Sequence, residues 1–342
     1  MLGCKMLKRR TEETVDTGSS QTTRVQPLKG AMGPVPFAFA PGGFLAQLRA
    51  GSVALWDTKT WKVAKTLPLA GAFAVGPLAD GSLAAVAAEA GGGARIVRIA
   101  QLDDAPQSFS GPLAKPFLLW AYVLPDKTPA SFLFISPNSQ YGLERVSLAS
   151  EGKAQREILF PMGPEDYASV ISLSPGTAAY YEGGTHHIVQ AAAQSPPVRF
   201  ALSAAVRPVR HLARGPGERE VWVSDDAGSV KRLELVEPVR VASELPPGPG
   251  RVFHLASSIT HLAVLWFEQP SDGTANRFTL IVYDATGKES FRTELPPSTR
   301  PEQRFVAVGP TAVLCGGSET FLAWSLDTGR LLLSTSSADS HP

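Results

Sequence analysis

The sequence predicts an all-β protein, a seven-bladed β-propeller built from four-stranded antiparallel blades. From residue 24 onward, short segments rich in Val, Leu, Phe and Ala alternate with clusters of Gly, Pro, Asp and Ser. This alternation is typical of short strands joined by turns. One strand-like segment also recurs seven times, at steps of roughly 40 to 50 residues, which is the period of a propeller blade.

The recurring segment is interpreted as the third strand of each blade. The seven copies are Val53–Trp56, Arg95–Ile99, Leu143–Leu148, Ile188–Ala191, Val230–Leu235, Thr279–Tyr283 and Phe321–Ser325. The fifth blade shows a full set of predicted strands, at 209–213, 220–224, 230–235 and 239–242, and the connection 224–229 contains the Gly and Asp that a tight hairpin needs. Seven blades of about 44 residues occupy about 310 residues, so we expect a single propeller domain over residues 24–336.

The two ends of the chain differ from the blades. Residues 1–23 are polar and charged without apolar periodicity, which predicts a flexible N-terminal tail, and residues 337–342 are expected to form a short C-terminal tail. Thr23–Leu28 and Arg330–Ser334 both have the character of an outer strand. With both included, the sequence offers eight candidate outer strands for seven blades. Since a ring must hide its strand edges, we expect one terminus to close the seventh blade and the other to lie against its rim.

Charge and hydrophobicity favour a soluble protein. The 342 residues are 44% hydrophobic, and 32 Lys and Arg face 31 Asp and Glu, so no global field would attract nucleic acid or an anionic membrane. No apolar stretch approaches the ~18 residues needed to cross a bilayer, and residues 1–10 are basic without the hydrophobic region of a signal peptide. We expect a cytoplasmic protein with no membrane span and no nucleic-acid partner.

Two cysteines are too few for a disulfide framework. Cys315 lies in an apolar run and is predicted to be a small buried core residue. Cys4 follows Leu2 and Gly3, a pattern that resembles the end of a bacterial lipoprotein signal whose hydrophobic part is missing. Lipid anchorage through Cys4 is therefore the alternative localisation, if the start of the chain is misplaced.

The first predicted blade resembles the WD-repeat family. Leu-Lys-Gly-Ala at 28–31, Phe-Ala-Pro-Gly-Gly at 39–43 and Val-Ala-Leu-Trp-Asp at 53–57 follow the family's L-x-G-H, F-S-P-D-G and V-x-L-W-D motifs. Later blades match only in part, at 80–81, 174–176 and Trp324. Ala31 replaces the family's His and Ala50 its turn Asp, so we expect the family's buried hydrogen-bond network to be absent and apolar packing between blades to hold the ring. The resemblance implies a protein-interaction scaffold with degenerate repeats.

Two histidines are the first candidates for chemistry. His211 and His254 occupy the same register on predicted innermost strands of neighbouring blades, where alternate side chains can face the central channel. Two imidazoles there could bind a metal ion or catalyse proton transfer. Neither strand supplies a carboxylate in matching register, and a metal needs a third or fourth ligand, so we predict structural roles and no metal site. His186 and His187 are predicted to belong to a solvated turn.

Other catalytic and cofactor motifs are missing from the sequence. There is no Gly-x-Ser-x-Gly elbow, no phosphate-binding Gly-rich loop followed by Lys and no paired-Cys zinc spacing. The turns at 284–288 and 327–330 resemble the Asp-x-Thr-Gly turns of quinoprotein propellers, but the Trp that should follow them is absent. We therefore expect no quinone and no other cofactor.

The candidates for partner binding are one tryptophan and a group of arginines. Trp61 stands where the family usually has Gly, and we predict an exposed turn at which it either anchors a partner or covers the N-terminal strand. Four arginines crowd the start and first turn of blade five, and their planar side chains suit protein interfaces; they are Arg207, Arg210, Arg214 and Arg219. The alternative is a solvated basic rim balanced by Glu218 and Glu220. Trp222 and Trp266 are predicted core residues.

These observations together predict a non-enzymatic scaffold that binds another protein. One alternative is a propeller lyase or hydrolase with His211 and His254 at the channel mouth, where blade tips converge. A second is a cell-surface ligand-binding lipoprotein anchored through Cys4.

Overall fold

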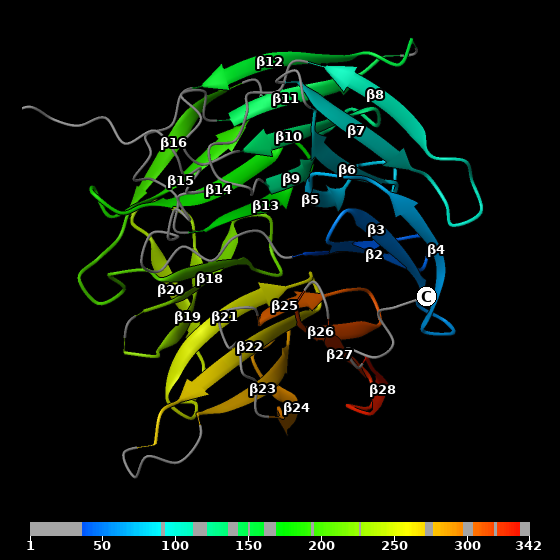
Figure 1. Cartoon of the computed structure of the whole chain (residues 1–342). Helices are drawn as coiled ribbons and strands as arrows, with labels where there is room; N and C mark the ends of the chain where they lie inside the picture. The colour runs from blue at the N-terminus through cyan, green and yellow to red at the C-terminus, as the bar shows by residue number, and fades with distance from the viewer. Residues whose placement is uncertain are drawn as a thin grey trace, which may run out of the picture.

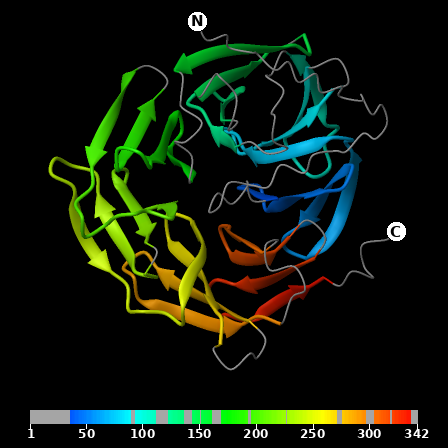
Figure 2. The ribbon, with the colours of Figure 1, turned by 60° about the vertical axis from the view of Figure 1, so that its left-hand side comes forward.

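The computed structural model is a ring of seven four-stranded antiparallel sheets (Figures 1 and 2). It describes residues 36–89, 93–111, 122–135, 143–149, 151–160, 169–192, 195–225, 227–270, 276–296, 304–317 and 320–335. Within these ranges all regular structure is β-strand, and no described helix is long and apolar enough to cross a membrane. The predicted all-β, seven-bladed propeller is confirmed.

Each blade uses four strands that are consecutive in the sequence. Blades one to four contain β1 to β4 (Phe37–Ala40, Phe44–Arg49, Ser52–Asp57, Lys62–Pro68), β5 to β8 (Ala72–Pro77, Leu83–Ala88, Ala94–Ile99, Gln107–Gly111), β9 to β12 (Tyr122–Pro125, Ser131–Ile135, Leu143–Leu148, Ala154–Phe160) and β13 to β16 (Val170–Ser174, Thr177–Glu182, His187–Ala192, Ser195–Ala201). Blades five to seven contain β17 to β20 (His211–Arg214, Glu220–Ser224, Val230–Glu234, Arg240–Glu244), β21 to β24 (Arg251–Ser257, His261–Glu268, Arg277–Asp284, Glu289–Glu294) and β25 to β28 (Phe305–Val308, Ala312–Gly316, Phe321–Ser325, Leu331–Ser334).

All seven predicted third strands are confirmed, as β3, β7, β11, β15, β19, β23 and β27. The hairpin between β18 and β19 also forms as predicted, because Gly228 adopts the left-handed backbone with φ of 84°. The first strand of blade five begins at His211 instead of Val209, which lies in the preceding loop with its side chain buried.

The C-terminal strand β28 forms the outer strand of blade seven by pairing with β27. The sequence left open which terminus closes blade seven, and in the structure residues 331–334 supply its outer strand. The competing segment 23–28, both predicted tails and Ala31 lie outside the described residues.

Seven apolar clusters hold the ring together, and each one joins two neighbouring blades. The cluster between the last blade and the first closes the ring, so that blade seven lies beside blade one in Figure 2. In this cluster the ring of Phe321 meets Phe37 and Trp56 edge-on, at centroid distances of 5.2 and 5.1 Å. The prediction that apolar packing joins the blades is confirmed.

Blade one nevertheless contains a buried polar link that the family motif does not predict. Gln47 is fully buried in β2, and its side-chain carbonyl accepts a hydrogen bond from Trp56 Nε1 at 2.9 Å. Arg49 Nε donates to the same oxygen at 3.1 Å. The indole N–H of the closing Trp is thus paired within its own blade.

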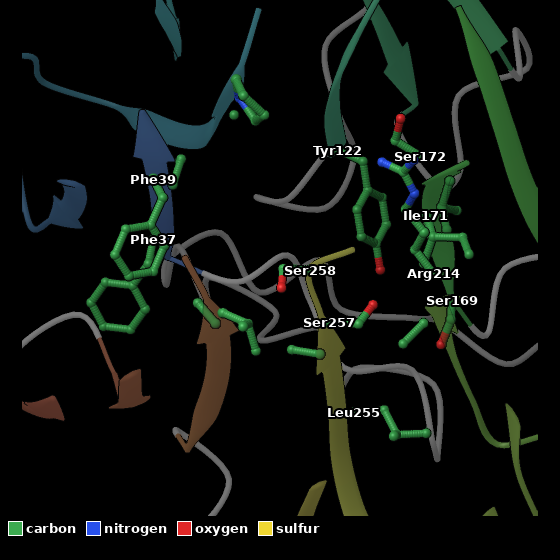
Figure 3. A pocket seen from close by; sticks show the side chains of 18 of the residues that line it. Phe37, Phe39, Tyr122, Ser169, Ile171, Ser172, Arg214, Leu255, Ser257 and Ser258 are labelled. Atoms are coloured by element: carbon green, nitrogen blue, oxygen red, sulfur yellow. The ribbon is translucent and has the colours of Figure 1, made fainter. Parts of the chain in front are cut away.

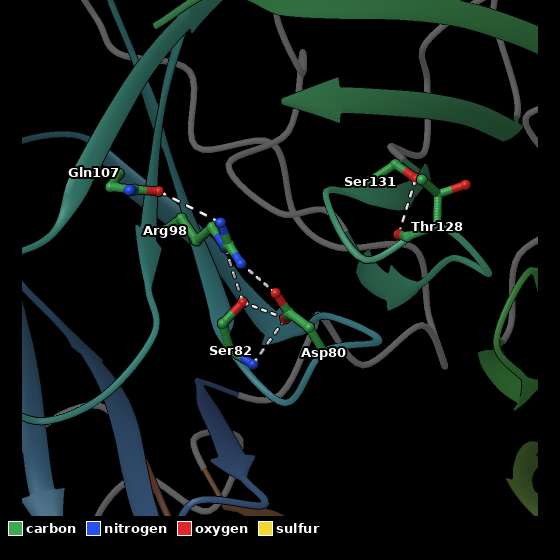
Figure 4. A network of polar contacts seen from close by, with 6 residues as sticks. All are labelled: Asp80, Ser82, Arg98, Gln107, Thr128 and Ser131. Atoms are coloured by element: carbon green, nitrogen blue, oxygen red, sulfur yellow. Dashed lines mark hydrogen bonds and ion pairs between the residues drawn. The ribbon is translucent and has the colours of Figure 1, made fainter. Parts of the chain in front are cut away.

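A second polar network ties the turn between β5 and β6 to the outer strands of blade two (Figure 4). The backbone N–H of Ser82 donates to Asp80 Oδ1 at 3.0 Å. Arg98 on β7 donates to Asp80 and to Ser82 Oγ, and it also reaches Gln107 on β8. The same figure shows Ser131 at the turn between β9 and β10, where its hydroxyl donates to the backbone oxygen of Thr128.

The strand directions define two faces of the ring. Because the strands of a blade alternate in direction, the chain enters each first strand at one face, where the hairpins between second and third strands also lie. We call this the N-terminal face. The hairpins between first and second strands lie at the opposite, C-terminal face.

Candidate functional site

The candidate site is a pocket of about 430 Å³ in the central channel. Residues of the first strands of all seven blades line it, together with Ser169 just before β13 and two residues of the turn after β21. Figure 3 shows Phe37 and Phe39 on one side of this space and Tyr122, Ser172 and Arg214 on the other. The channel is thus a site at which seven segments far apart in the sequence converge.

His211 and His254 both line the pocket, and the structure brings them together. Their ring centroids lie 6.4 Å apart, with the ring planes at 57°. His211 is half-buried, and its Nδ1 lies 2.9 Å from the hydroxyl of Ser224, which is fully buried on the neighbouring strand β18. The matching register seen in the sequence therefore does correspond to proximity in space.

His254 is the more deeply buried imidazole, with 8% of its surface exposed. The pairing of β21 with β22 shifts register between Val252 and His254. The backbone N–H of Val306 donates to His254 Nδ1 at 3.4 Å, and the ring of Phe305 stands edge-on at 6.0 Å. Burial, together with the nearby charge of His211, lowers the pKa of His254 to about 3. His254 is therefore neutral near pH 7, with its proton on Nε2.

The residues that could add metal ligands to this pair do not gather around it. Across the described ranges, His, Cys, Asp and Glu nowhere form a group of three that could hold a metal ion. Two imidazoles alone leave a metal site incomplete. His186 lies instead in the turn between β14 and β15, where its Nδ1 is 2.7 Å from the hydroxyl of Tyr181.

The four arginines of blade five do not form one cluster. Arg207 and Arg210 are exposed in the loop that enters β17 at the N-terminal face, whereas Arg214 ends β17 and Arg219 is exposed in the turn beyond it. The four residue steps from Arg210 to Arg214 span about 13 Å in an extended strand. The interpretation as one crowded group is therefore wrong, because a whole strand separates the two pairs.

The prediction of an exposed Trp61 is also wrong. Trp61 is 8% exposed and belongs to the apolar cluster that joins blades one and seven. Its φ of 53° is left-handed, as expected at a position where the family has Gly. The turn is held by Asp57, whose side chain accepts hydrogen bonds from the backbone of Lys59 and the hydroxyl of Thr60. The indole thus packs against the seam between the two blades.

The remaining predicted residues have simple outcomes. Trp222, Trp266 and Cys315 are buried, as predicted. Cys4 lies outside the described residues.

Sequence reasoning missed the rest of the channel lining, above all Tyr122, Ser169, Ser172 and Ser257. These residues lie in or beside first strands, as do the two histidines. Their position in or beside first strands is the sequence feature that could have predicted them. For Tyr122 this was difficult, because the strand pattern of the sequence is weak in the stretch that follows it.

Comparison with solved structures supports the fold. The chain aligns with the β-propeller domain of Cps50 (Swd1) from Myceliophteria thermophila at a TM-score of 0.57 and 13% identity, covering 91% of this chain and 100% of that one. Hsv2 from Kluyveromyces lactis aligns at 0.57 and 11% identity, with coverages of 89% and 99%. Virginiamycin B lyase from Staphylococcus aureus aligns at 0.54 and 12% identity, with coverages of 84% and 92%.

Comparison by sequence finds no relative. No protein-family model matches the chain, and no curated protein matches it. At identities of 11 to 13% the structural similarities establish the fold and leave the activity open. The chain is a seven-bladed β-propeller of four-stranded antiparallel blades.

Proposed function

We propose that this propeller is a non-enzymatic scaffold that binds an acidic segment of another protein at the N-terminal face of blade five. The observation that carries the proposal is a firmly held loop, residues 202–210, that presents the exposed side chains of Arg207 and Arg210. Arginine suits this role because its planar guanidinium pairs with carboxylates in a bidentate geometry.

Several contacts hold this loop in place. Lys231 Nζ donates to the backbone oxygen of Ala205 at 2.8 Å, and the backbone N–H of Arg210 donates to Ser224 at 2.7 Å. Val206 and Val209 are each 3% exposed and anchor the loop in the cluster between blades four and five. A surface that is ordered before binding loses less conformational entropy when a partner arrives.

The test is the double charge reversal R207E/R210E. A tagged wild-type chain should capture a stoichiometric partner from its native source, and the double variant should lose that partner. The matched control is R219E/R330E, which makes the same charge change at two exposed arginines in turns at the C-terminal face. Retention of the partner by both variants would show that this loop is not the interface, and failure of the wild type to capture any partner would contradict the scaffold itself.

The rival function is a lyase or hydrolase in the channel. The proximity of His211 and His254 favours it, as does the occurrence of the fold in virginiamycin B lyase. Against it, His254 is a poor proton acceptor near pH 7, since a general base works best when its pKa lies near the operating pH. Metal analysis of the purified protein, with H211A and H254A as controls, distinguishes the two functions: a bound metal that either substitution removes would favour the enzyme.

A further inference from the structure

The central channel is divided into two chemically different arcs. Blades seven, one and two contribute Phe37, Phe39, Val75, Pro77 and Val308, and none of their described lining residues is polar. We call this the apolar arc. Every polar side chain that lines the pocket comes from blades three to six, which we call the polar arc.

Arg214 is the one permanently charged side chain among the described lining residues, which include no Asp, Glu or Lys. Within the described part of the chain its guanidinium forms no ion pair, and its buried Nε has no hydrogen-bond partner. Burial lowers the pKa of Arg214 by more than the nearby Glu218 raises it. A partly buried guanidinium with no ion pair and an unsatisfied Nε is costly, so an anion that entered the channel would be stabilised here.

The direction of this side chain follows from strand alternation. Along β17 successive residues face opposite neighbours: Leu212 packs in the cluster with blade four and Ala213 in the cluster with blade six. Arg214 therefore faces blade four. Figure 3 shows it pointing toward Tyr122, beside Ser172 and Ile171.

Three hydroxyl-bearing residues line the same part of the pocket as this guanidinium. Ser169, Ser172 and Tyr122 belong to the same arc, and burial raises the pKa of Tyr122, so its hydroxyl keeps its proton and can donate. A guanidinium with nearby hydroxyl donors matches the two oxygens of a carboxylate.

We propose that the channel binds a small organic carboxylate whose acid group pairs with Arg214 and whose apolar body lies against the apolar arc. The volume of about 430 Å³ falls within the usual range of pockets for small ligands. The site is independent of the loop at 202–210, because it lies inside the ring, and both could be occupied together.

The experiment is calorimetric titration of the full chain with phenylacetate, octanoate, phenylacetamide and inorganic phosphate. Phenylacetate and octanoate should bind, and the uncharged phenylacetamide should bind at least about tenfold more weakly because it cannot form a charged, bidentate pair with a guanidinium. R214Q should weaken phenylacetate binding by a similar factor. R214K should fall between R214Q and the wild type, because lysine keeps the charge and loses the planar fork.

The matched control is R219Q, which removes an exposed arginine five residues away and should change the affinity by less than about twofold. F39A should weaken octanoate binding, since Phe39 belongs to the apolar arc. Equal binding of phenylacetate and phenylacetamide, or equal binding by R214Q and the wild type, would overturn the proposal. Phosphate binding as tight as that of phenylacetate would overturn the role assigned to the apolar arc.

Discussion

Replacing Phe321 by alanine perturbs the seam between blades seven and one. Phe321 is 2% exposed, and its ring meets both Phe37 and Trp56 of blade one edge-on. Removing a buried Phe side chain costs about 3 to 5 kcal/mol, and each edge-to-face pair contributes about 0.5 to 1.5 kcal/mol. Because these contributions overlap, we expect F321A to lower the free energy of unfolding by about 4 to 5 kcal/mol.

Two further variants separate the contributions. F321L keeps most of the buried volume and removes both ring pairs, so its expected cost is about 1 to 2 kcal/mol. F132A is the matched control for location: Phe132 is fully buried in the cluster between blades two and three, and its ring pairs with that of Phe134. It should cost a similar free energy without opening the seam.

The assay combines urea unfolding, followed by tryptophan fluorescence, with native-state hydrogen exchange. F321A should speed amide exchange first in β1 and β27, whereas F132A should do so first in β10. A cost below about 1 kcal/mol for F321A, or unchanged exchange in β1, would refute the view that apolar packing closes this ring.

Two other predictions concern buried polar groups. Q47L leaves the indole N–H of Trp56 without its acceptor and should lower the free energy of unfolding by about 1 to 3 kcal/mol. In a W56F background the same substitution should cost less, because no indole N–H is left unpaired. A cost of Q47L alone near zero in urea unfolding would contradict the role of Gln47. The folded-state pKa of His254, about 3, lies below the ordinary value of 6.5, so the unfolded chain binds more protons between these values and stability should fall as the pH drops through this window. NMR titration should show His254 still neutral at pH 5, and H254L should make stability less dependent on pH in this window; a His254 titration near pH 6.5 would contradict the burial argument.

Much of the fold was predictable because each third strand is packed between neighbouring blades. The copies at 143–148 and 230–234, for example, combine buried apolar residues with a regular period, and hairpin glycines such as Gly228 mark the turns. Period and turn chemistry are local properties of the chain, so sequence reasoning finds them.

The candidate site was only partly predictable. The shared register of His211 and His254 indicated their proximity, because neighbouring blades repeat the same geometry. The prediction of one arginine group in blade five was wrong, since residues close in sequence lie at opposite ends of a strand. Trp61 misled as well, because a left-handed turn directs its indole onto the seam instead of into solvent.

The sequence by itself determined the strand period, the number of blades and the apolar character of the interfaces between them. Only the tertiary structure decided which side chains meet at the axis and which of them lack partners. Arg214 shows the physical reason: its environment consists of Tyr122 and Ser172 from two other blades, and closure of the ring, a property of all seven blades together, brings these residues into one pocket.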